Sequence, residues 1–307
     1  MSRFIEIVEV GPRDGLQNEA VVVSVEDRIE LIRRLEAAGA RRTEVVSLVN
    51  PKRVPQMAGA EEIMAGLPKA EGRSRIGLVL NAKGFDRAVE AGVDEANISL
   101  AASDGFAQAN SGMTVAQQLD MVAEIAERAH NFAGSGAGGP RLSATVSTVW
   151  GCPFDGEVSV EQVASVVARL AELKIPEIAL ADTIGAGDPW AVTRKVEAAK
   201  KAAPDATLRL HFHDTRNTGL ANAYAGVEAG VSVLDASVGG LGGCPFAPGA
   251  TGNIGTEDLV YMLHRGGFET GYDLEALIET ARWIGGKIGK APASRLSRAG
   301  GFPKPRA

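Results

Sequence analysis

Leu208-Arg-Leu-His-Phe-His-Asp214 is a short run in which apolar and polar residues alternate up to a polar end, a pattern that is typical of a strand. Residues i and i+2 of a strand lie on one face, so His211 and His213 are expected side by side. Two neighbouring imidazoles at a strand end can share one divalent metal. The alternative is an ordinary hydrogen-bonded strand end, and the rest of the chain helps to decide between the two.

The same rhythm continues on both sides of this strand. An amphipathic stretch follows at 221–229, and the next β-branched run is at 233–237. Earlier runs lie at 4–10, 43–48, 76–81, 95–100, 142–149 and 177–181, and helical patterns such as 25–38, 114–132 and 160–173 lie between them. Strict alternation predicts parallel strands with right-handed crossovers. Eight units in 307 residues favour a (β/α)8 TIM barrel, usually about 250 residues long, over a doubly wound open sheet.

Segments outside this rhythm complete the predicted organisation. The glycine-rich stretch 134–139 is expected to be a loop, and an additional helical region is expected from Tyr261 to about Ile288. The sequence thus predicts one catalytic domain over 1–288, a barrel with extra C-terminal helices, and a basic, flexible tail over 289–307. No acidic residue follows Glu279, so a role of the tail in holding the phosphates of a nucleotide-like ligand is the alternative.

Composition limits the class of protein. The hydrophobic content of 45% supports a folded core, and the net charge of −6 argues against a general nucleic-acid binder. No stretch approaches 18 uninterrupted apolar residues, so no membrane span is expected. The first residues enter a strand pattern without an apolar leader, which favours a cytoplasmic protein. In that compartment Cys152 and Cys244 are expected to be free thiols, with a single disulfide as the alternative.

Polar residues recur where the predicted strands end. The active site of a TIM barrel lies at the carboxyl ends of its strands, so residues that are scattered in sequence converge there. The residues expected to converge are Arg13, Asp14, Glu44, Asp182, Thr183, His211, His213, Cys244 and Asn253.

Asp14, His211, His213 and Asn253 form a mixed oxygen and nitrogen ligand set. Such a set favours Mg²⁺ or Mn²⁺ over zinc, with water or substrate oxygens at the remaining positions. The alternatives are a helix N-cap or turn at Asp14, beside Gly15, and a simple turn at Asn253, after Gly252.

One thiol lies among six glycines in residues 239–252, GGLGGCPFAPGATG, where a pocket lid and a surface loop are equally compatible with the spacing. A thiol with an ordinary pKa near 8.5 is mostly protonated at pH 7. Cys244 can therefore serve as an acid or as a nucleophile, whereas Cys152, in Trp150-Gly-Cys-Pro-Phe154, is expected to be structural.

Several long motifs resemble the 3-hydroxy-3-methylglutaryl-CoA (HMG-CoA) lyase family. They are Val10-Gly-Pro-Arg-Asp-Gly-Leu-Gln-Asn-Glu19, Pro51-Lys-Arg-Val-Pro-Gln-Met57, His211-Phe-His-Asp-Thr215, Gly240-Leu-Gly-Gly-Cys-Pro245 and Thr256-Glu-Asp-Leu-Val-Tyr-Met262. The resemblance extends from about Phe4 to Ile288. It implies a metal-dependent TIM barrel, with no organic cofactor, that cleaves 3-hydroxyacyl-CoA thioesters by a retro-Claisen reaction.

The resemblance also implies roles for individual residues. The family's metal ligands match Asp14, His211, His213 and Asn253, its catalytic arginine and cysteine match Arg13 and Cys244, its acidic site residues match Glu44 and Asp182, and Gln17, Thr145 and Thr183 are expected to contact substrate. A metal would polarise the C3 hydroxyl, and Asp14, with Glu44 or Asp182 as alternatives, would accept its proton. Arg13 would stabilise the enolate and Cys244 would protonate the acetyl-CoA carbanion.

Two departures concern the acyl group. Thr145 and Ala179 stand where the family often has Tyr and Ser, and His213-Asp-Thr-Arg-Asn217 replaces His-Asp-Thr-Tyr-Gly, so that Arg216 faces solvent, pairs with an acid or contacts substrate. The expected substrate is (S)-HMG-CoA, which gives acetyl-CoA and acetoacetate, and citramalyl-CoA is the alternative.

More distant alternatives are a Claisen-condensing acyltransferase, whose usual long C-terminal extension is not seen, a biotin-linked carboxyltransferase, and a non-catalytic CoA-binding paralogue. The family further implies a homodimer and a role in leucine degradation.

Overall fold

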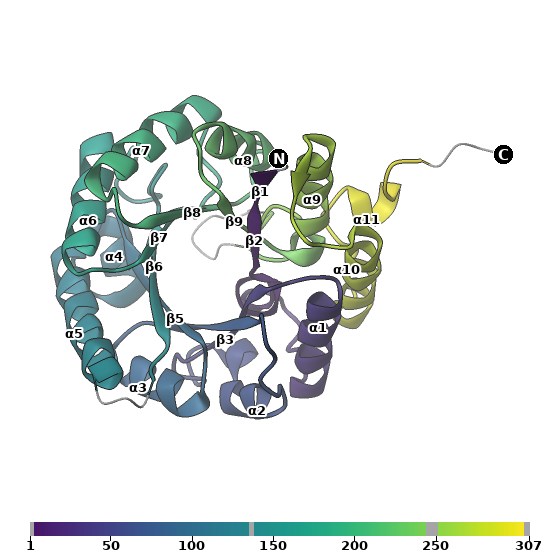
Figure 1. The fold of residues 1–307 in the computed structure, drawn as a ribbon, viewed down its shortest axis with the longest axis horizontal. Coiled ribbons are helices and arrows are strands. Elements are labelled where there is room, and N and C mark those ends of the chain that lie inside the picture. The colour runs from purple at the N-terminus through teal and green to yellow at the C-terminus, as the bar shows by residue number, and fades with distance from the viewer. Residues whose placement is uncertain (1–2, 135–137, 244–250, 304–307) are drawn as a thin grey trace.

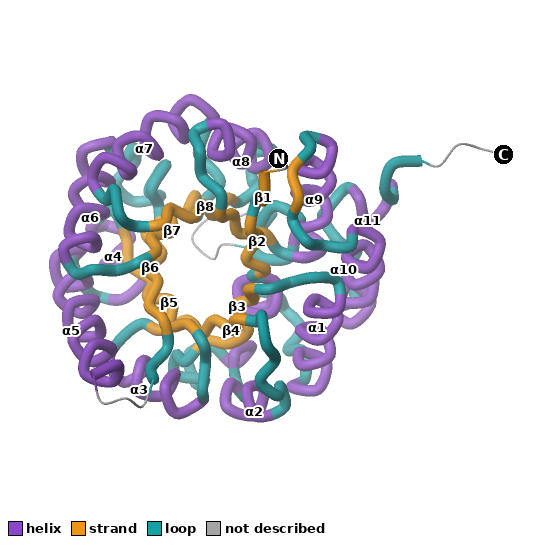
Figure 2. The backbone as a smooth tube through the Cα atoms, in the orientation of Figure 1, coloured by secondary structure: helices purple, strands orange, loops and turns teal. Residues whose placement is uncertain are grey.

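The strands close into a barrel surrounded by helices (Figures 1 and 2). The structure is a computed structural model and describes residues 3–134, 138–243 and 251–303. Its barrel strands are β2 (Glu6–Glu9), β3 (Arg42–Ser47), β4 (Ser74–Val79), β5 (Glu95–Ala101), β6 (Arg141–Ser147), β7 (Glu177–Asp182), β8 (Thr207–Phe212) and β9 (Val233–Ala236). All neighbours pair in parallel, and β9 pairs back with β2. The predicted (β/α)8 barrel is therefore confirmed.

The first predicted strand is divided in two. Its start, β1 (Arg3–Phe4), leaves the barrel and pairs in parallel with β10 (Phe268–Glu269). The amide of Ile5 then donates to the carbonyl of Glu269, and the amide of Glu6 donates to Ser232 beside β9. The hydrogen-bond partner thus changes between Ile5 and Glu6, which the sequence pattern alone does not reveal.

The helices form the outer layer. They are α1 (Val25–Ala37), α2 (Ala60–Ala65), α3 (Ala82–Ala91), α4 (Asp104–Ser111), α5 (Val115–Gly134), α6 (Val160–Glu172), α7 (Pro189–Ala202), α8 (Gly219–Glu228), α9 (Thr256–Arg265), α10 (Leu274–Ile288) and α11 (Leu296–Ala299). Three short turns are η1 (Gly11–Gly15), η2 (Pro55–Met57) and η3 (Val238–Gly240). Local signals set the helix starts: the Ser159 hydroxyl accepts the Gln162 amide N–H in a capping box that begins α6. Among the described residues, no helix combines the length and the hydropathy that crossing a bilayer requires.

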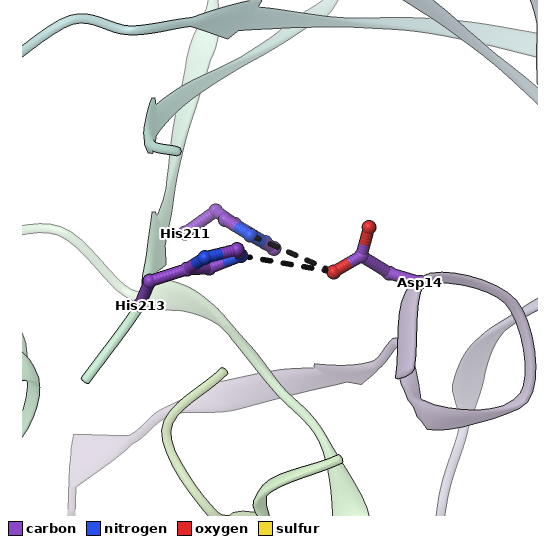
Figure 3. A group of neighbouring side chains, drawn as sticks. All are labelled: Asp14, His211 and His213. Carbon is purple, nitrogen blue, oxygen red and sulfur yellow. Dashed lines mark ion pairs between the residues drawn. The ribbon is translucent and has the colours of Figure 1, made fainter. Parts of the chain in front are cut away.

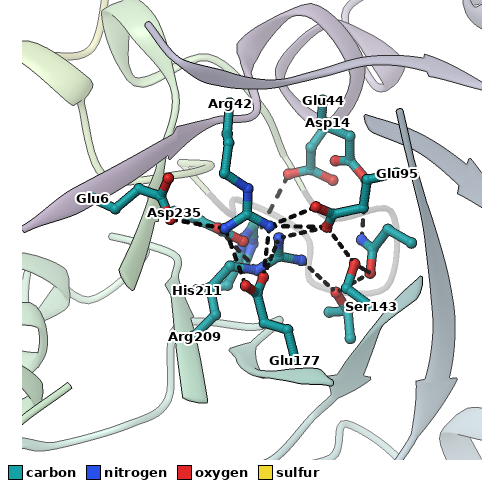
Figure 4. A network of polar contacts seen from close by, with 12 residues as sticks. Glu6, Asp14, Arg42, Glu44, Glu95, Ser143, Glu177, Arg209, His211 and Asp235 are labelled. Carbon is teal, nitrogen blue, oxygen red and sulfur yellow. Dashed lines mark hydrogen bonds and ion pairs between the residues drawn. The ribbon is translucent and has the colours of Figure 1, made fainter. Parts of the chain in front are cut away.

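The inside of the barrel is unusually polar. Interior positions of TIM barrels are commonly filled by branched aliphatic residues, and here Val8, Val10, Ile76 and Val233 form only a small apolar cluster. Much of the remaining interior is occupied by buried charged side chains, among them Arg42, Glu95, Glu177 and Arg209 (Figure 4). The main apolar core lies instead between the outward face of the strands and the helices.

The C-terminal region differs from the prediction in two ways. Its first helix, α9, begins at Thr256 rather than after Tyr261, and the tail expected to be flexible includes α11. The amides of Arg295 and Leu296 donate to the carboxylate of Asp258, over 2.8 and 2.7 Å. These contacts fix the segment on α9, because a buried carboxylate such as Asp258 needs hydrogen-bond donors. Residues 304–307, and 135–137 of the predicted glycine-rich loop, lie outside the described residues.

Candidate active site

A cavity of about 340 Å³ lies at the carboxyl ends of the strands. Eight of the predicted site residues line it together: Arg13, Asp14, Gln17, Glu44, Thr145, Thr183, His211 and His213. Polar residues that the sequence analysis did not select also line it: Asn18, Arg53, Asn97, Ser99, Asn110, Ser147 and Asp235. The convergence expected for a barrel site is therefore present.

The turn η1 presents Arg13 and Asp14 to this cavity. The amides of Arg13, Asp14 and Gly15 all donate to the carbonyl of Val10, which closes a π-helical turn directly after β2. Gly15 allows the turn to pack closely, because a Cβ there would lie 2.7 Å from Oγ of Ser237. Two consecutive predicted site residues are thus fixed at the barrel mouth.

Asp14, His211 and His213 form a cluster that could bind a metal ion (Figure 3). Oδ2 of Asp14 lies 4.0 Å from Nε2 of His211 and 3.9 Å from Nε2 of His213. Ligand atoms that are each about 2.1 Å from one ion lie roughly 3 Å apart when adjacent and roughly 4 Å apart when opposite, so the cluster leaves space for an ion. His211 lies in β8 and His213 directly follows it, and the strand alternation turns both imidazoles to the same side, as predicted.

Asn253 lies beside this cluster and contributes a side-chain oxygen that has no hydrogen-bond partner among the described residues. Its Nδ2 donates to Oδ2 of Asp14 over 2.7 Å and to the carbonyl of Leu241 over 3.0 Å. Its Oδ1 is buried and has no hydrogen-bond donor within the described parts of the chain. A buried carbonyl oxygen without a donor is costly, and such an oxygen is a good ligand for a hard cation. The four predicted ligands therefore fit a divalent metal.

The charges around Asp14 keep its carboxylate ionised. Burial opposes ionisation, but the guanidinium of Arg13 and the two imidazoles outweigh it and hold the pKa of Asp14 well below its usual range. Oδ1 of Asp14 lies 2.9 Å from Nη1 of Arg13. Asp14 is therefore a carboxylate at every pH of interest, which is the form that binds a cation.

Arg13 is also bound to Glu44 from β3. Its Nε donates to Oε2 of Glu44 over 2.8 Å, and Oε1 of Glu44 accepts from Nδ2 of Asn97 over 3.2 Å. Burial lowers the pKa of Arg13, but Glu44 and Asp14 outweigh this and raise it, so the guanidinium stays charged. The site thus contains a fixed positive charge directly beside the candidate metal ligands Asp14, His211 and His213.

Asp182 does not reach the cavity with these residues. Its carboxylate accepts the amide N–H groups of Ala186 and Gly187 over 2.8 and 2.9 Å, and it is fully buried. Burial raises its pKa, although the two amides oppose the rise. The cavity is lined instead by its neighbours Ala181 and Thr183, because adjacent residues at a strand end point to opposite faces.

Thr145, Ala179 and Arg216, the residues that depart from the family pattern, do not all lie together. Oγ1 of Thr145 donates to Oδ1 of Asn97 over 3.0 Å, and Thr145 pairs in register with the buried Ala179 of β7. Arg216 is exposed, and its Nη1 donates to the carbonyls of Ile184 and Gly185. Arg216 therefore supports the loop after β7, and among the described residues it has no contact with Asp14, His211 or His213.

The predicted catalytic cysteine, Cys244, lies outside the described residues, as do residues 245–250. The described chain reaches Gly243, which lines the cavity and accepts a hydrogen bond from Nδ2 of Asn18 over 3.1 Å. Cys152 is a buried free thiol whose sulfur accepts the amide N–H groups of Phe154 and Asp155. The disulfide alternative is thus not found at Cys152.

Asp235, from β9, is the most informative of the residues that sequence analysis missed. Its Oδ2 lies 3.1 Å from Nδ1 of His211, and its side chain is 4% exposed. The sequence signal was a lone carboxylate inside the apolar run Val233-Leu-Asp-Ala236. A charged residue within a predicted buried strand points to the barrel interior and to a partner there.

A closed parallel barrel with a possible metal cluster in a cavity at its strand ends defines a TIM-barrel enzyme. The family model described as HMGL-like matches residues 4–284. Together with the full-length relatives below, this match shows that the chain belongs to the HMGL-like family.

Relatives match over nearly their whole length. A 3-hydroxy-3-isohexenylglutaryl-CoA/hydroxymethylglutaryl-CoA lyase of Pseudomonas aeruginosa is 42% identical, with 97% of this chain and 98% of the relative covered. An (R)-citramalyl-CoA lyase of Chloroflexus aurantiacus is 40% identical, with 96% and 95% covered. The structure of an HMG-CoA lyase from Acinetobacter baumannii with coenzyme A and 3-methylmalate superposes with a TM-score of 0.91, at 40% identity, and 98% of each chain is covered.

Proposed function

We propose that this protein is a divalent-metal-dependent carbon–carbon lyase that cleaves (S)-HMG-CoA to acetyl-CoA and acetoacetate. The observation that carries the proposal is the arrangement of Asp14, His211, His213 and Asn253 beside a buried, ionised Arg13. Relatives that bear the name hydroxymethylglutaryl-CoA lyase, at about 40% identity over the full chain, support the same activity.

The reaction breaks the C2–C3 bond, turns the C3 hydroxyl into a carbonyl and leaves a thioester enolate. A bound divalent cation would lower the pKa of that hydroxyl and orient the substrate. Asp14 is the proposed proton acceptor, because its Oδ2 faces both histidines at the proposed metal site. Glu44, which also lines the cavity, is the alternative. Asp182, the other candidate acceptor, is turned to the backbone of Ala186 and Gly187.

Arg13 places a permanent positive charge where enolate charge develops. Its fixed contacts with Asp14 and Glu44 hold it in position before substrate arrives, so the stabilisation requires little reorganisation. The enolate carbon then takes a proton, and Cys244 is the proposed donor. This completes acetyl-CoA and leaves acetoacetate.

The substrate thioester is proposed to reach the cluster past Gln17 and Thr183, with the acyl group near Thr145. At the cavity edge, Arg53 is exposed, and within the described residues it forms no ion pair. CoA carries phosphates, and arginine is well suited to bind them. We therefore assign to Arg53 the recognition of the CoA portion.

The second candidate substrate is citramalyl-CoA, which the same chemistry splits into acetyl-CoA and pyruvate. It is the second candidate because Thr145 and Ala179 stand where the family often has Tyr and Ser, and because a citramalyl-CoA lyase is among the full-length relatives. Mg²⁺ or Mn²⁺ is the proposed metal, because carboxylate, amide oxygen and imidazole suit both. We further propose a cytoplasmic homodimer that acts in leucine breakdown.

The test is acetyl-CoA release by the purified full-length protein with Mg²⁺. HMG-CoA is compared with (R)- and (S)-citramalyl-CoA, and EDTA treatment and Cys244→Ala are the controls. Efficient HMG-CoA cleavage that both controls abolish supports the proposal. A preference for a citramalyl-CoA reassigns the substrate, near-normal cleavage by Cys244→Ala removes the proton donor, and no turnover of any thioester overturns the proposed activity.

A further inference from the structure

A chain of charged contacts leads from His211 away from the cavity. Asp235 contacts His211 with Oδ2, over 3.1 Å to Nδ1, and faces Arg209 with Oδ1, over 3.3 Å to Nε (Figure 4). Asp235 is 4% exposed and Arg209 is 2% exposed. Within the described chain, Oδ1 of Asp235 accepts no hydrogen bond, so the ion pair with Arg209 is what holds that oxygen.

These contacts determine which nitrogen of His211 faces the metal cluster. A carboxylate accepts hydrogen bonds, so this contact favours the tautomer in which Nδ1 of His211 carries the proton and donates it to Asp235. Nε2, which faces Oδ2 of Asp14, then presents its lone pair to the cluster. The orientation of His211 therefore depends on the position of the Asp235 carboxylate.

Arg209 is itself held from several sides. Its Nη1 lies 3.2 Å from Oε1 of Glu177 and 3.7 Å from Oε1 of Glu95, and its Nη2 donates to Oγ1 of Thr145 over 3.3 Å. Arg42 binds both glutamates in turn, from the same interior layer of the barrel. The guanidinium is thus fixed on the side opposite to Asp235, and it cannot turn away without leaving buried charges unpaired.

Arg141 belongs to the same network but ends elsewhere. Its Nη1 and Nη2 donate to Glu95 and Glu177 over 3.1 and 3.0 Å, and its side chain is 41% exposed. No contact links it to Asp235. An Arg141 variant is therefore a control: it disturbs the buried charges in general but not the contact between Asp235 and His211.

We propose that Arg209 is a positioning residue of the metal centre: through Asp235 it holds His211 in the Nδ1–H form and thereby sets the affinity for the divalent cation. The inference rests on the proposed metal site, but it does not require the proposed substrate. Partners of this kind behind a metal-ligating histidine commonly change metal affinity by about 10- to 100-fold when they are removed.

The test measures Mn²⁺ binding to the full-length protein by calorimetry and by the loss of the free Mn²⁺ EPR signal. Arg209→Met and Asp235→Asn are expected to raise the Kd by about 10- to 100-fold, and Arg141→Gln by less than about threefold. The double variant Arg209→Met/Asp235→Asn is expected to bind no more weakly than the weaker single variant, since Arg209 acts through Asp235.

A second measurement reports on the imidazole directly. The chain has four histidines, so ¹⁵N-histidine labelling of the metal-free protein at alkaline pH, where the imidazole is neutral, gives a spectrum in which the Nδ1–H form of His211 can be assigned. That form is expected to be lost in Arg209→Met and kept in Arg141→Gln. If Arg209→Met does not fold, Arg209→Lys is used in both measurements, because lysine keeps the positive charge but lacks the planar guanidinium with its several N–H donors.

The proposal is overturned by wild-type Mn²⁺ affinity in the Arg209 variant, by an equal loss in Arg141→Gln, by additive losses in the double variant, or by an unchanged His211 spectrum. Because these measurements need no substrate, they distinguish a wrong positioning role from a wrong assignment of the lyase reaction. A protein that binds Mn²⁺ through this network without cleaving HMG-CoA would keep the inference and refute the proposed function.

Discussion

Arg13 and Glu44 form a buried pair in which Nε of Arg13 lies 2.8 Å from Oε2 of Glu44, and Asn97 holds the other carboxylate oxygen. Glu44→Gln keeps an acceptor for Arg13 but removes the negative charge that fixes the guanidinium. We expect kcat to fall by about 10- to 100-fold, or roughly 1.4–3 kcal/mol of transition-state stabilisation, with an unchanged Mn²⁺ Kd.

Steady-state kinetics with HMG-CoA and Mn²⁺ calorimetry check this expectation. Glu36→Gln is the matched control, because Glu36 pairs with a different arginine, Arg75, outside the cavity. A wild-type kcat in Glu44→Gln, or a parallel loss in Glu36→Gln, would contradict a role of Glu44 in positioning Arg13.

Asp182→Asn tests the carboxylate that sequence analysis named as an alternative base. Because Asp182 accepts the amides of Ala186 and Gly187 away from the cavity, its replacement should act on stability. Asn retains one acceptor oxygen, so we expect a loss of about 1–3 kcal/mol in unfolding free energy and a kcat within about fivefold of wild type. Urea unfolding and initial rates measure both, and a kcat reduced by 100-fold or more with unchanged stability would return Asp182 to the catalytic group.

The barrel and the cluster were predictable because they depend on local periodicity. Alternation along residues 208–213 fixes the common face of His211 and His213, and strand–helix alternation brings distant strand ends together. The direction in which each side chain points at a strand end was not predictable. Asp182 and Thr183 are adjacent, so their side chains cannot both face the cavity. Partners of interior charges were not predictable either, since the pairing of Arg209 with Asp235 depends on the register of β8 and β9.

Glu9→Gln tests a buried carboxyl behind the site. Glu9 is fully buried, its Oε1 accepts the amides of Gly11 and Val238, and its Oε2 accepts the hydroxyl of Thr256. Burial raises its pKa from the ordinary value of 4.5 to about 7, against these hydrogen bonds. Between these two pH values the unfolded chain releases a proton that the folded protein keeps, so stability falls as the pH rises.

The stabilising contribution is therefore complete below pH 4.5 and is lost as the pH rises through about 7, with a limiting slope of about 1.4 kcal/mol per pH unit. Glu9→Gln should flatten the stability profile by roughly that slope, because its side chain does not titrate. Urea unfolding at pH 5, 6 and 7 gives the difference between the variant and wild type. The surface variant Glu124→Gln should run parallel to wild type, and a parallel profile for Glu9→Gln would refute the raised pKa.

Arg53→Gln tests how the cavity edge recognises the thioester. If Arg53 binds the CoA phosphates, the variant should raise KM for HMG-CoA by about tenfold, as expected for the loss of one charge-assisted contact of about 1.4 kcal/mol, and leave kcat within about twofold. The matched substrate is the HMG thioester of pantetheine, which lacks every phosphate. Its kinetics should be the same in the variant and in wild type. Equal losses with both thioesters would place Arg53 on the acyl carboxylate, and no loss with either would remove it from substrate binding.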